Sequence, residues 1–271
     1  MLELVDVSYR YPGYARLVLH DLNLRIDDGE IVGLVGANES GKSTLCLVAS
    51  GLAPASVGGV LKGSVLVDRA PLAGRPTHEL AALVGLVFQS PNTQRSGVTG
   101  TVFEEVALGP VNLGVPVAET LARTREALAL LRIADLADRN PAELSGGQAQ
   151  LVAIASILAM RPRHLVLDEP TAQLDPEGTR LVGEALRALA GTGTALLIAE
   201  HKTDLLDGLC QRVVALEAGA MVLDAPAAET LGSPTLEEIG VEAPSRVRIR
   251  RRLENLGLHV PPALDAVAAL P

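Results

Sequence analysis

The chain has 271 residues, enough for one large domain, or for a domain with an appendage, around a sizeable core. It carries 23 Lys and Arg residues against 32 Asp and Glu residues, a formal net charge of −9, so its average field repels polyanions and we expect no nucleic-acid partner. The longest nearly unbroken apolar run, residues 151–160, is shorter than the roughly 20 residues of a membrane-spanning helix, so we predict no bilayer crossing.

The first third of the chain has the pattern of short strands separated by glycine-rich or charged turns. It starts with alternating apolar and acidic residues rather than an export signal, which predicts a cytoplasmic location. The predicted strands are residues 2–7, 22–26, 31–35, 64–68 and 83–88.

The later part of the chain alternates helical and strand patterns. We predict helices at residues 116–131, 148–160 and 176–190, and buried strands at residues 164–168 and 195–199. Strands that alternate with helices predict a mostly parallel, helix-covered sheet, so the expected fold class is α/β. After about residue 216, prolines separate short helical pieces up to residue 269, which predicts a small C-terminal appendage.

A nine-residue segment between strand 31–35 and a helical run from residue 45 has the composition of a phosphate-binding loop (P-loop). Glycines let backbone N–H groups turn inward around phosphate oxygens, and the helix N-terminus adds positive potential. Lys42 is expected to reach the β- and γ-phosphates, and Ser43 to ligate Mg²⁺. The strand-loop-helix context disfavours a plain glycine-rich turn. The predicted nucleotide-binding residues are Gly36, Ala37, Asn38, Glu39, Ser40, Gly41, Lys42, Ser43 and Thr44.

A second anion-binding sequence stands at the start of the predicted helix 148–160. It consists of Ser145, Gly146, Gly147 and Gln148. One chain does not need two such cradles for one phosphate, so we expect this one to serve a nucleotide held by another subunit. The alternative is a simple N-cap by Ser145, which explains the serine but not both glycines.

Adjacent carboxylates end the buried strand 164–168. Burying Asp168 and Glu169 there is unfavourable unless they serve a charged group. Asp168 is expected to hold Mg²⁺ directly or through water. Glu169 is expected to act as general base toward the attacking water, an effect worth roughly 10²- to 10⁴-fold in rate. The alternative is a pair of surface carboxylates that cap the strand end.

These motifs, in this order, resemble those of ABC ATPases from residue 2 to about residue 216. The resemblance implies a P-loop NTPase core in the α/β class, with a mostly parallel sheet flanked by helices. It also implies an N-terminal antiparallel β subdomain, and an inserted α-helical subdomain at about residues 92–160. The ATP-binding domain then covers residues 1–216, and the helical appendage at residues 217–271 is expected to dimerise. ATP and Mg²⁺ are the expected ligands.

The same resemblance implies roles for four further residues. Tyr11 matches the aromatic residue that stacks on adenine, although an isolated tyrosine is more often a packing residue. Gln89 matches the glutamine that senses Mg²⁺ and communicates with a membrane partner. Asp175 lies in a loop that crosses the dimer interface, and His201 matches the switch histidine at the γ-phosphate. The expected catalytic residues are therefore Glu169 and His201, and the expected metal-binding residues are Ser43, Gln89 and Asp168.

Flanking segments narrow the resemblance to the energy-coupling-factor (ECF) ATPases of cobalt, nickel and vitamin uptake. They are residues 85–92, 101–110, 199–202 and 253–269. This group implies a peripheral position on the cytoplasmic face of the cell membrane. It also implies a second ATPase subunit, in a homodimer or heterodimer, on a transmembrane coupling protein that works with a substrate-capturing membrane protein. The alternative is a soluble ABC ATPase without a transporter, of the assembly-factor type.

Two residues depart from the ABC pattern. Glu39 replaces a P-loop glycine, and its carboxylate is expected to weaken nucleotide binding unless it points to solvent. Leu151 replaces an arginine shortly after the second motif. The arginine-rich run 246–252 allows a lipid or nucleic-acid interpretation, but we favour a charged face of the appendage, paired with acidic residues across the dimer.

Overall fold

The computed structural model describes residues 1–261. Its strands are β1 (Leu2–Arg10), β2 (Leu19–Ile26), β3 (Ile31–Gly36), β4 (Val60–Val67), β5 (Ala70–Pro71), β6 (Val84–Val87), β7 (His164–Asp168), β8 (Ala195–Ala199), β9 (Arg212–Glu217) and β10 (Ala220–Pro226). Its α-helices are α1 (Lys42–Ala49), α2 (Leu52–Ala55), α3 (Thr77–Leu83), α4 (Pro91–Gln94), α5 (Val102–Asn112), α6 (Val117–Leu130), α7 (Gly146–Leu158), α8 (Pro176–Ala190), α9 (Thr203–Leu206), α10 (Ala227–Gly232), α11 (Pro234–Glu238) and α12 (Ser245–Asn255).

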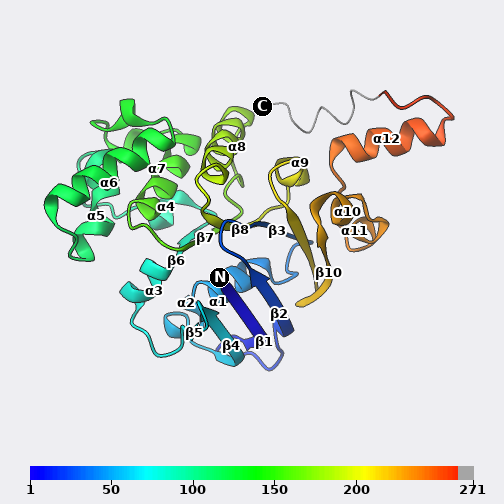
Figure 1. The fold of residues 1–271 in the computed structure, drawn as a ribbon, viewed down its shortest axis with the longest axis horizontal. Coiled ribbons are helices and arrows are strands. Elements are labelled where there is room, and N and C mark those ends of the chain that lie inside the picture. The colour runs from blue at the N-terminus through cyan, green and yellow to red at the C-terminus, as the bar shows by residue number, and fades with distance from the viewer. Residues whose placement is uncertain (262–271) are drawn as a thin grey trace.

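A six-stranded sheet forms the centre of the molecule, in the order β10-β9-β3-β8-β7-β6 (Figure 1). All neighbouring strands are parallel except β9 and β10, which form an antiparallel hairpin. The strands β3, β8 and β7 are adjacent, so their carboxyl ends lie at one edge of the sheet. That edge is where ligands bind in open α/β sheets.

Both faces of this sheet are buried, which explains why its strands are continuously apolar. Along β8, Leu196 and Ile198 contribute to one hydrophobic cluster, whereas Ala195, Leu197 and Ala199 contribute to another. The alternation follows from the two-residue period of a strand. The first cluster lies against helices α7 and α8, and the second includes α1.

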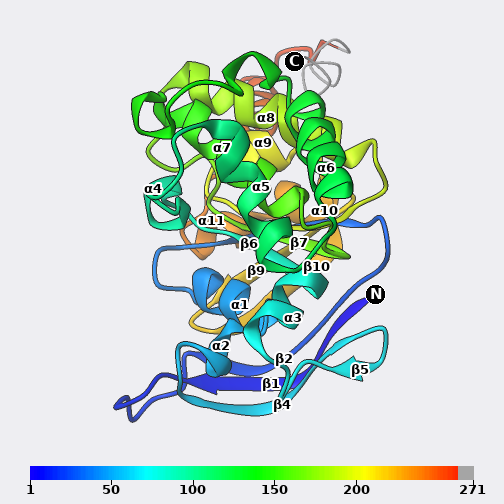
Figure 2. The same cartoon turned by 90° about the vertical axis from the view of Figure 1, so that its left-hand side faces the viewer.

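A separate antiparallel sheet, β2-β1-β4-β5, encloses the second cluster from the other side. Leu2, Leu4 and Val7 of β1 pack in the same cluster as Leu45 and Val48 of α1. Figure 2 shows this sheet at one end of the molecule and the helices α5 to α8 at the other, with the parallel strands between them. The fold class predicted from the sequence, including the N-terminal antiparallel subdomain and the helical insertion, is confirmed.

In the helical subdomain, helix α5 has a capping box at its N-terminus. Thr101 caps the helix through the backbone N–H of Glu104, and the Glu104 side chain accepts from the Thr101 backbone N–H in return. This reciprocal capping box satisfies two donors at the helix start. Val106 of α5, Leu128 of α6 and Ile154 of α7 meet in the first cluster, so the subdomain shares its core with the main sheet.

The hairpin β9–β10 crosses residue 216, where the sequence analysis ended the ATP-binding domain. The expectation of only short helical pieces after that residue missed β10, because its alternating burial is weak and it lies at the sheet edge. Helices α10, α11 and α12 follow. The predicted segment 253–269 is described only to residue 261, and the remainder lies outside the described residues.

The arginine-rich helix α12 forms ion pairs within its own chain. Arg246 pairs with Asp207, which also raises the pKa of the arginine. Arg248 lies 3.0 Å from a Glu242 oxygen. In addition, Arg251 lies 2.7 Å from Glu237. The run is therefore a charged face paired with acidic residues, but these partners belong to the same chain and not to a second subunit.

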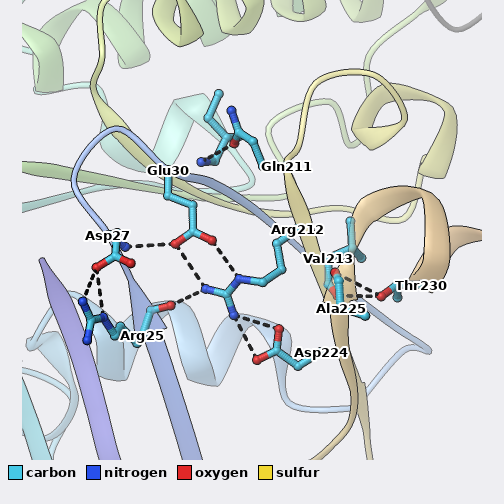
Figure 3. Close-up of polar contacts among 10 residues, drawn as sticks. Arg25, Asp27, Glu30, Gln211, Arg212, Val213, Asp224, Ala225 and Thr230 are labelled. Carbon is cyan, nitrogen blue, oxygen red and sulfur yellow. Dashed lines mark hydrogen bonds and ion pairs between the residues drawn. The ribbon is translucent and has the colours of Figure 1, made fainter.

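A polar cluster around Arg212 joins the two sheets (Figure 3). The Arg212 guanidinium contacts Glu30 at 2.8 Å, Asp224 of β10 at 2.7 Å, and the Arg25 carbonyl of β2. The two carboxylates raise the pKa of Arg212, and its side chain is 22% exposed. A partly buried guanidinium with this many acceptors fixes the parallel sheet against the N-terminal sheet.

None of the helices within residues 1–261 is long and apolar enough to cross a membrane.

Candidate nucleotide-binding site

The P-loop connects the carboxyl end of β3 to the start of α1. A Cβ atom on Gly36 would lie 2.4 Å from Ser40 Oγ and 2.5 Å from the Leu216 carbonyl oxygen, so this position admits no side chain. Gly41 has a φ of 107°, which also favours glycine. The loop therefore depends on its glycines for the backbone path that turns N–H groups toward a ligand.

Lys42 stands at the centre of the loop and is 5% exposed. Its Nζ donates to the carbonyl oxygens of Gly36 and Ala37, at 3.0 and 3.1 Å, and lies 3.8 Å from Glu169 Oε1. Burial lowers the pKa of this ammonium group. Ser40 Oγ is also buried and has no hydrogen-bond partner among residues 1–261. A buried cation and an orphaned hydroxyl fit a site that an anionic ligand completes.

Two of the predicted metal ligands lie side by side. Ser43 Oγ donates to Asp168 Oδ1 at 3.0 Å, although the two residues are 125 positions apart in the chain. Burial raises the pKa of Asp168, which a bound cation would reverse. The third predicted ligand, Gln89, donates its Nε2 to Glu169 Oε2 at 2.9 Å, which leaves its Oε1 as the oxygen for a metal. This donor set of hydroxyl, carboxylate and amide oxygens suits Mg²⁺.

The Glu169 carboxylate contacts three other predicted site residues. One oxygen lies 2.7 Å from His201 Nε2, and the other accepts from Gln89. Lys42 approaches the same group. Glu169 has a φ of 48°, a left-handed conformation that is costly for a residue with a side chain and that recurs at functional sites. Segments from β6, β7 and β8 thus converge where an attacking water and a γ-phosphate would have to meet.

Tyr11 lies beside the start of α1. Its hydroxyl is 3.1 Å from Thr44 Oγ1, and its ring is 5.0 Å from Tyr9 and 6.1 Å from Tyr14. The structure therefore brings Tyr11 to the P-loop helix, and the stacking on adenine stays a prediction. Tyr14 is 54% exposed, and the sequence analysis did not consider it.

The Ser145 to Gln148 segment lies at the exposed start of α7 and makes a local capping box. Ser145 Oγ accepts from the Gln148 backbone N–H at 3.3 Å, and Gln148 Oε1 accepts from the Ser145 N–H at 3.1 Å. A Cβ atom on Gly147 would lie 2.6 Å from Gly178 Cα of α8, so close helix packing also requires a glycine there. The N-cap alternative therefore explains Ser145 and Gln148, helix packing explains Gly147, and Gly146 is left without a full structural reason.

Asp175 caps α8, with its Oδ1 accepting from the Gly178 N–H at 2.7 Å. The loop before it packs on the start of α7, since a Cβ atom on Gly146 would lie 3.3 Å from Leu174 Cδ2. The loop and the Ser145 to Gln148 segment therefore form one surface.

The two departures from the expected pattern have local explanations. Glu39 is exposed and takes a φ of 62°, the left-handed conformation for which a glycine is suited. Leu151 is 2% exposed in the first hydrophobic cluster and contacts no predicted catalytic group. Sequence reasoning gave no role to Glu200, which is buried directly before His201.

A strand, a glycine-rich loop and a helix place the buried Lys42 and Ser43 at one edge of the sheet. The end of β7 brings Asp168 and Glu169 to the same edge. This arrangement defines a P-loop ATPase. The family model described as "ABC transporter" matches residues 19–172, which is more than half of the chain. The chain belongs to the ABC transporter family, as an ATP-binding subunit that hydrolyses ATP.

Relatives align over nearly the whole chain. A putative ABC transporter ATP-binding protein of Pyrococcus abyssi is 40% identical, over 95% of this chain and 92% of the relative. The energy-coupling factor transporter ATP-binding protein EcfA of Methanosarcina acetivorans is 37% identical over 96% and 92% of the two chains. EcfA2 of Symbiobacterium thermophilum is 38% identical over 97% and 93%.

Solved structures agree with the fold. CbiO1 from Clostridium perfringens, described as part of the ABC transporter complex CbiONQ, superimposes with a TM-score of 0.77 at 29% identity. The alignment covers 94% of this chain and 96% of CbiO1. A dimeric ATP-binding cassette in a post-hydrolysis state with ADP and phosphate has a TM-score of 0.71 at 26% identity, over 84% and 99% of the two chains.

Proposed function

We propose that this chain is the ATP-hydrolysing subunit of an ECF-type importer for a vitamin or a transition-metal ion. It works as a nucleotide-sandwich dimer on a transmembrane coupling protein, at the cytoplasmic face of the membrane. The observation that carries the proposal is the similarity to EcfA and EcfA2, which covers 96% and 97% of this chain and so includes the appendage. The proposed transporter type is thus supported by the similarity to these relatives, whereas the proposed ATP hydrolysis is supported by the geometry of the site.

In the proposed chemistry, the P-loop and Lys42 bind the triphosphate, and Tyr11 stacks on the base. Mg²⁺, held by Ser43, Asp168 and Gln89, would neutralise charge on the β- and γ-phosphate oxygens. Glu169 accepts a proton from the attacking water, and His201 contacts the γ-phosphate. The close approach of Lys42, Gln89 and His201 to one carboxylate supports these assignments.

Two exposed surfaces support the proposed dimer. The Ser145 to Gln148 segment presents a helix start with an outward-facing glycine, which suits the phosphates of a second subunit's nucleotide. On the appendage, Ile249, Leu256 and Leu258 are 48%, 60% and 55% exposed, an apolar surface that a partner would cover. ATP must favour the closed dimer over the open one in order to drive a transport step.

A groove beside the Gln89 loop is the proposed docking site for the coupling protein. Its lining comes from α4, α5 and α7 and includes Asn92, Glu105 and Ala153. Glu105 is buried and accepts from the Ser96 backbone N–H and hydroxyl, both at 2.6 Å. A groove whose wall contains the segment next to Gln89 offers a direct route from ATP to the membrane partner.

Recovery from membranes tests the proposal. A tagged chain, extracted from membranes in detergent, is expected to co-purify with a polytopic protein that mass spectrometry identifies as the coupling protein. Asn92→Arg places a bulky charge in the groove and should abolish that recovery, whereas Ala228→Arg on the exposed side of α10 should keep it. Recovery of the unmodified chain only outside membranes, without a polytopic protein, contradicts the proposal and favours the alternative of an ABC ATPase without a transporter.

A further inference from the structure

Glu200, at the carboxyl end of β8, is a buried carboxylate that has no part in the chemistry proposed above. It is 2% exposed. One of its oxygens accepts from the backbone N–H and the hydroxyl of Thr171. The other accepts from the backbone N–H groups of His201 and Lys202, at 2.9 and 3.2 Å. Each carboxylate oxygen thus serves a different loop.

Lys202 makes a second link between the loop after β8 and Thr171. Its Nζ donates to the Thr171 carbonyl at 3.1 Å and to Thr179 Oγ1 of α8 at 2.8 Å. Thr171 is fully buried, and the Glu200 backbone N–H donates to the Leu34 carbonyl of β3 at 3.0 Å. The loop that carries His201 is therefore attached both to the loop that ends at Asp175 and to the strand before the P-loop.

The chemistry of this link requires a carboxylate. Burying an acidic group costs free energy unless it is hydrogen-bonded, and all four groups around Glu200 can donate. A glutamine at this position has one acceptor oxygen, so its NH₂ group would face backbone donors on one side. Such a substitution would release one of the two loops while leaving the P-loop and Lys42 in place.

We propose that Glu200 is a positioning residue that transmits the position of the loop 171–175 to His201. The inference rests on the proposed roles of His201 and of that loop at the dimer interface. When a partner subunit moves Asp175, Thr171 moves too, and the Glu200 oxygen that accepts from Thr171 shifts. The other Glu200 oxygen then moves the His201 backbone, because it accepts from the His201 N–H. The separation of 2.7 Å between His201 Nε2 and Glu169 Oε1 then changes. Engagement of a partner thus sets the geometry of hydrolysis.

The test is steady-state ATP hydrolysis by the full chain, with ATP affinity measured separately by equilibrium binding. The proposed dimer should hydrolyse ATP with a sigmoidal dependence on ATP concentration. Glu200→Gln should flatten that dependence and lower kcat about 10- to 100-fold, as a misplacement of about 1 Å does, with ATP affinity unchanged. Thr171→Val should behave alike, and Thr171→Ser, which keeps the hydroxyl, should restore the parental values. Glu229→Gln, an exposed acidic residue on α10, controls for the loss of charge and should be unaffected.

Several results would overturn the inference. A parental kcat and parental ATP dependence in Glu200→Gln would do so. A fall in ATP affinity and melting temperature without a change in kcat would assign Glu200 a purely structural role. Where Glu200→Gln does not fold, Thr171→Val decides: parental kinetics overturn the inference. His201→Ala separates this failure from a failure of the proposed site, because an active His201→Ala enzyme contradicts the histidine assignment itself.

Discussion

Glu39 occupies the P-loop with a backbone φ of 62° and an exposed side chain. Glycine adopts that conformation without the roughly 1 kcal/mol or more that a side chain costs. The carboxylate also places negative charge close to the expected phosphates, and such a repulsion is worth about 1 kcal/mol at a surface site. Exposure lets Glu39 remain, but at some cost to both stability and affinity.

We therefore predict that Glu39→Gly binds ATP about fivefold more tightly than the parent, as about 1 kcal/mol implies. Glu39→Gln separates the two effects, because it removes the charge and keeps the left-handed side chain. It should reproduce the gain in affinity without a gain in melting temperature. Equilibrium binding and thermal unfolding check both variants, and weaker binding by Glu39→Gln would show that the carboxylate assists the nucleotide.

His164 makes stability depend on pH. Its ring is 2% exposed, neither ring nitrogen has a hydrogen-bond partner among the described residues, and burial lowers its pKa to about 4. Burial is the largest cause of this lowered pKa; the N-terminal ammonium group and Arg163 contribute to it, and Asp28 opposes it. Since the unfolded histidine takes up a proton near pH 6.5, stability is complete above that pH and is lost as the pH falls toward 4.

The expected loss reaches about 3 kcal/mol between pH 6.5 and pH 4. His164→Gln should flatten this part of the curve of unfolding free energy against pH. His78→Gln, which changes an exposed histidine on α3, should leave the curve as it is in the parent. Denaturant unfolding at several pH values makes the measurement, and equal slopes for the parent and His164→Gln would contradict this assignment.

At the residue scale, sequence patterns predicted the groups that meet in the site, because each lies within a short motif at a strand end. Lys42, Asp168, Glu169 and His201 all converge in the structure. Glu200 was missed because its meaning depends on Thr171, which lies 29 positions away and carries no motif. Long-range hydrogen bonds of this kind leave no periodic signal in a sequence.

The helices α7 and α8 touch through two glycines, and this contact controls the surface that the Ser145 to Gln148 segment presents. A Cβ atom on Gly147 would lie 2.6 Å from backbone of Gly178, whereas one on Gly146 would lie 3.3 Å from a flexible leucine end. Gly147→Ala should lower unfolding free energy by about 1–3 kcal/mol through overpacking, and Gly146→Ala by much less. Denaturant unfolding of the pair checks this, and equal losses would contradict the contact.

The Arg212 cluster predicts a second difference between matched variants. Arg212→Met removes a partly buried guanidinium from two carboxylates and should cost about 2 kcal/mol, less than a fully buried pair because the group is 22% exposed. Arg25→Met removes an arginine whose pair with Asp27 is exposed to solvent, and should leave the stability close to that of the parent. If both cost the same in denaturant unfolding, the cluster does not hold the sheets together.

At the element scale, three predicted elements have the observed bounds: β7, α8 and β8. The two strands are fully buried, and α8 begins with a proline at its first turn, so the apolar pattern of the sequence matches the observed burial. Helix α5 and strands β9 and β10 were missed. The exposed valines and glycines around α5 blur its period, and β10 pairs with β9 by backbone bonds that need little apolar pattern.

At the scale of the whole molecule, the order of strands could not be derived from the chain alone. The order β10-β9-β3-β8-β7-β6 brings β3 and β7 to either side of β8, so that the P-loop, Glu169 and His201 share one edge. Only the resemblance to a known family implied that arrangement. The alternation of strand and helix patterns along the chain did predict a mostly parallel, helix-covered sheet.

In the proposed cycle, ATP joins two copies of this ATPase, or this chain and a related one, until Glu169 permits hydrolysis. Glu169→Gln keeps the nucleotide contacts and removes the base, so hydrolysis should fall roughly 10²- to 10⁴-fold. Light scattering after size exclusion with Mg²⁺ and ATP should then show a dimer, provided that the chain pairs with itself. Lys42→Ala, which lacks the buried ammonium, is the control and should remain monomeric. Hydrolysis by Glu169→Gln at the parental rate would contradict the account.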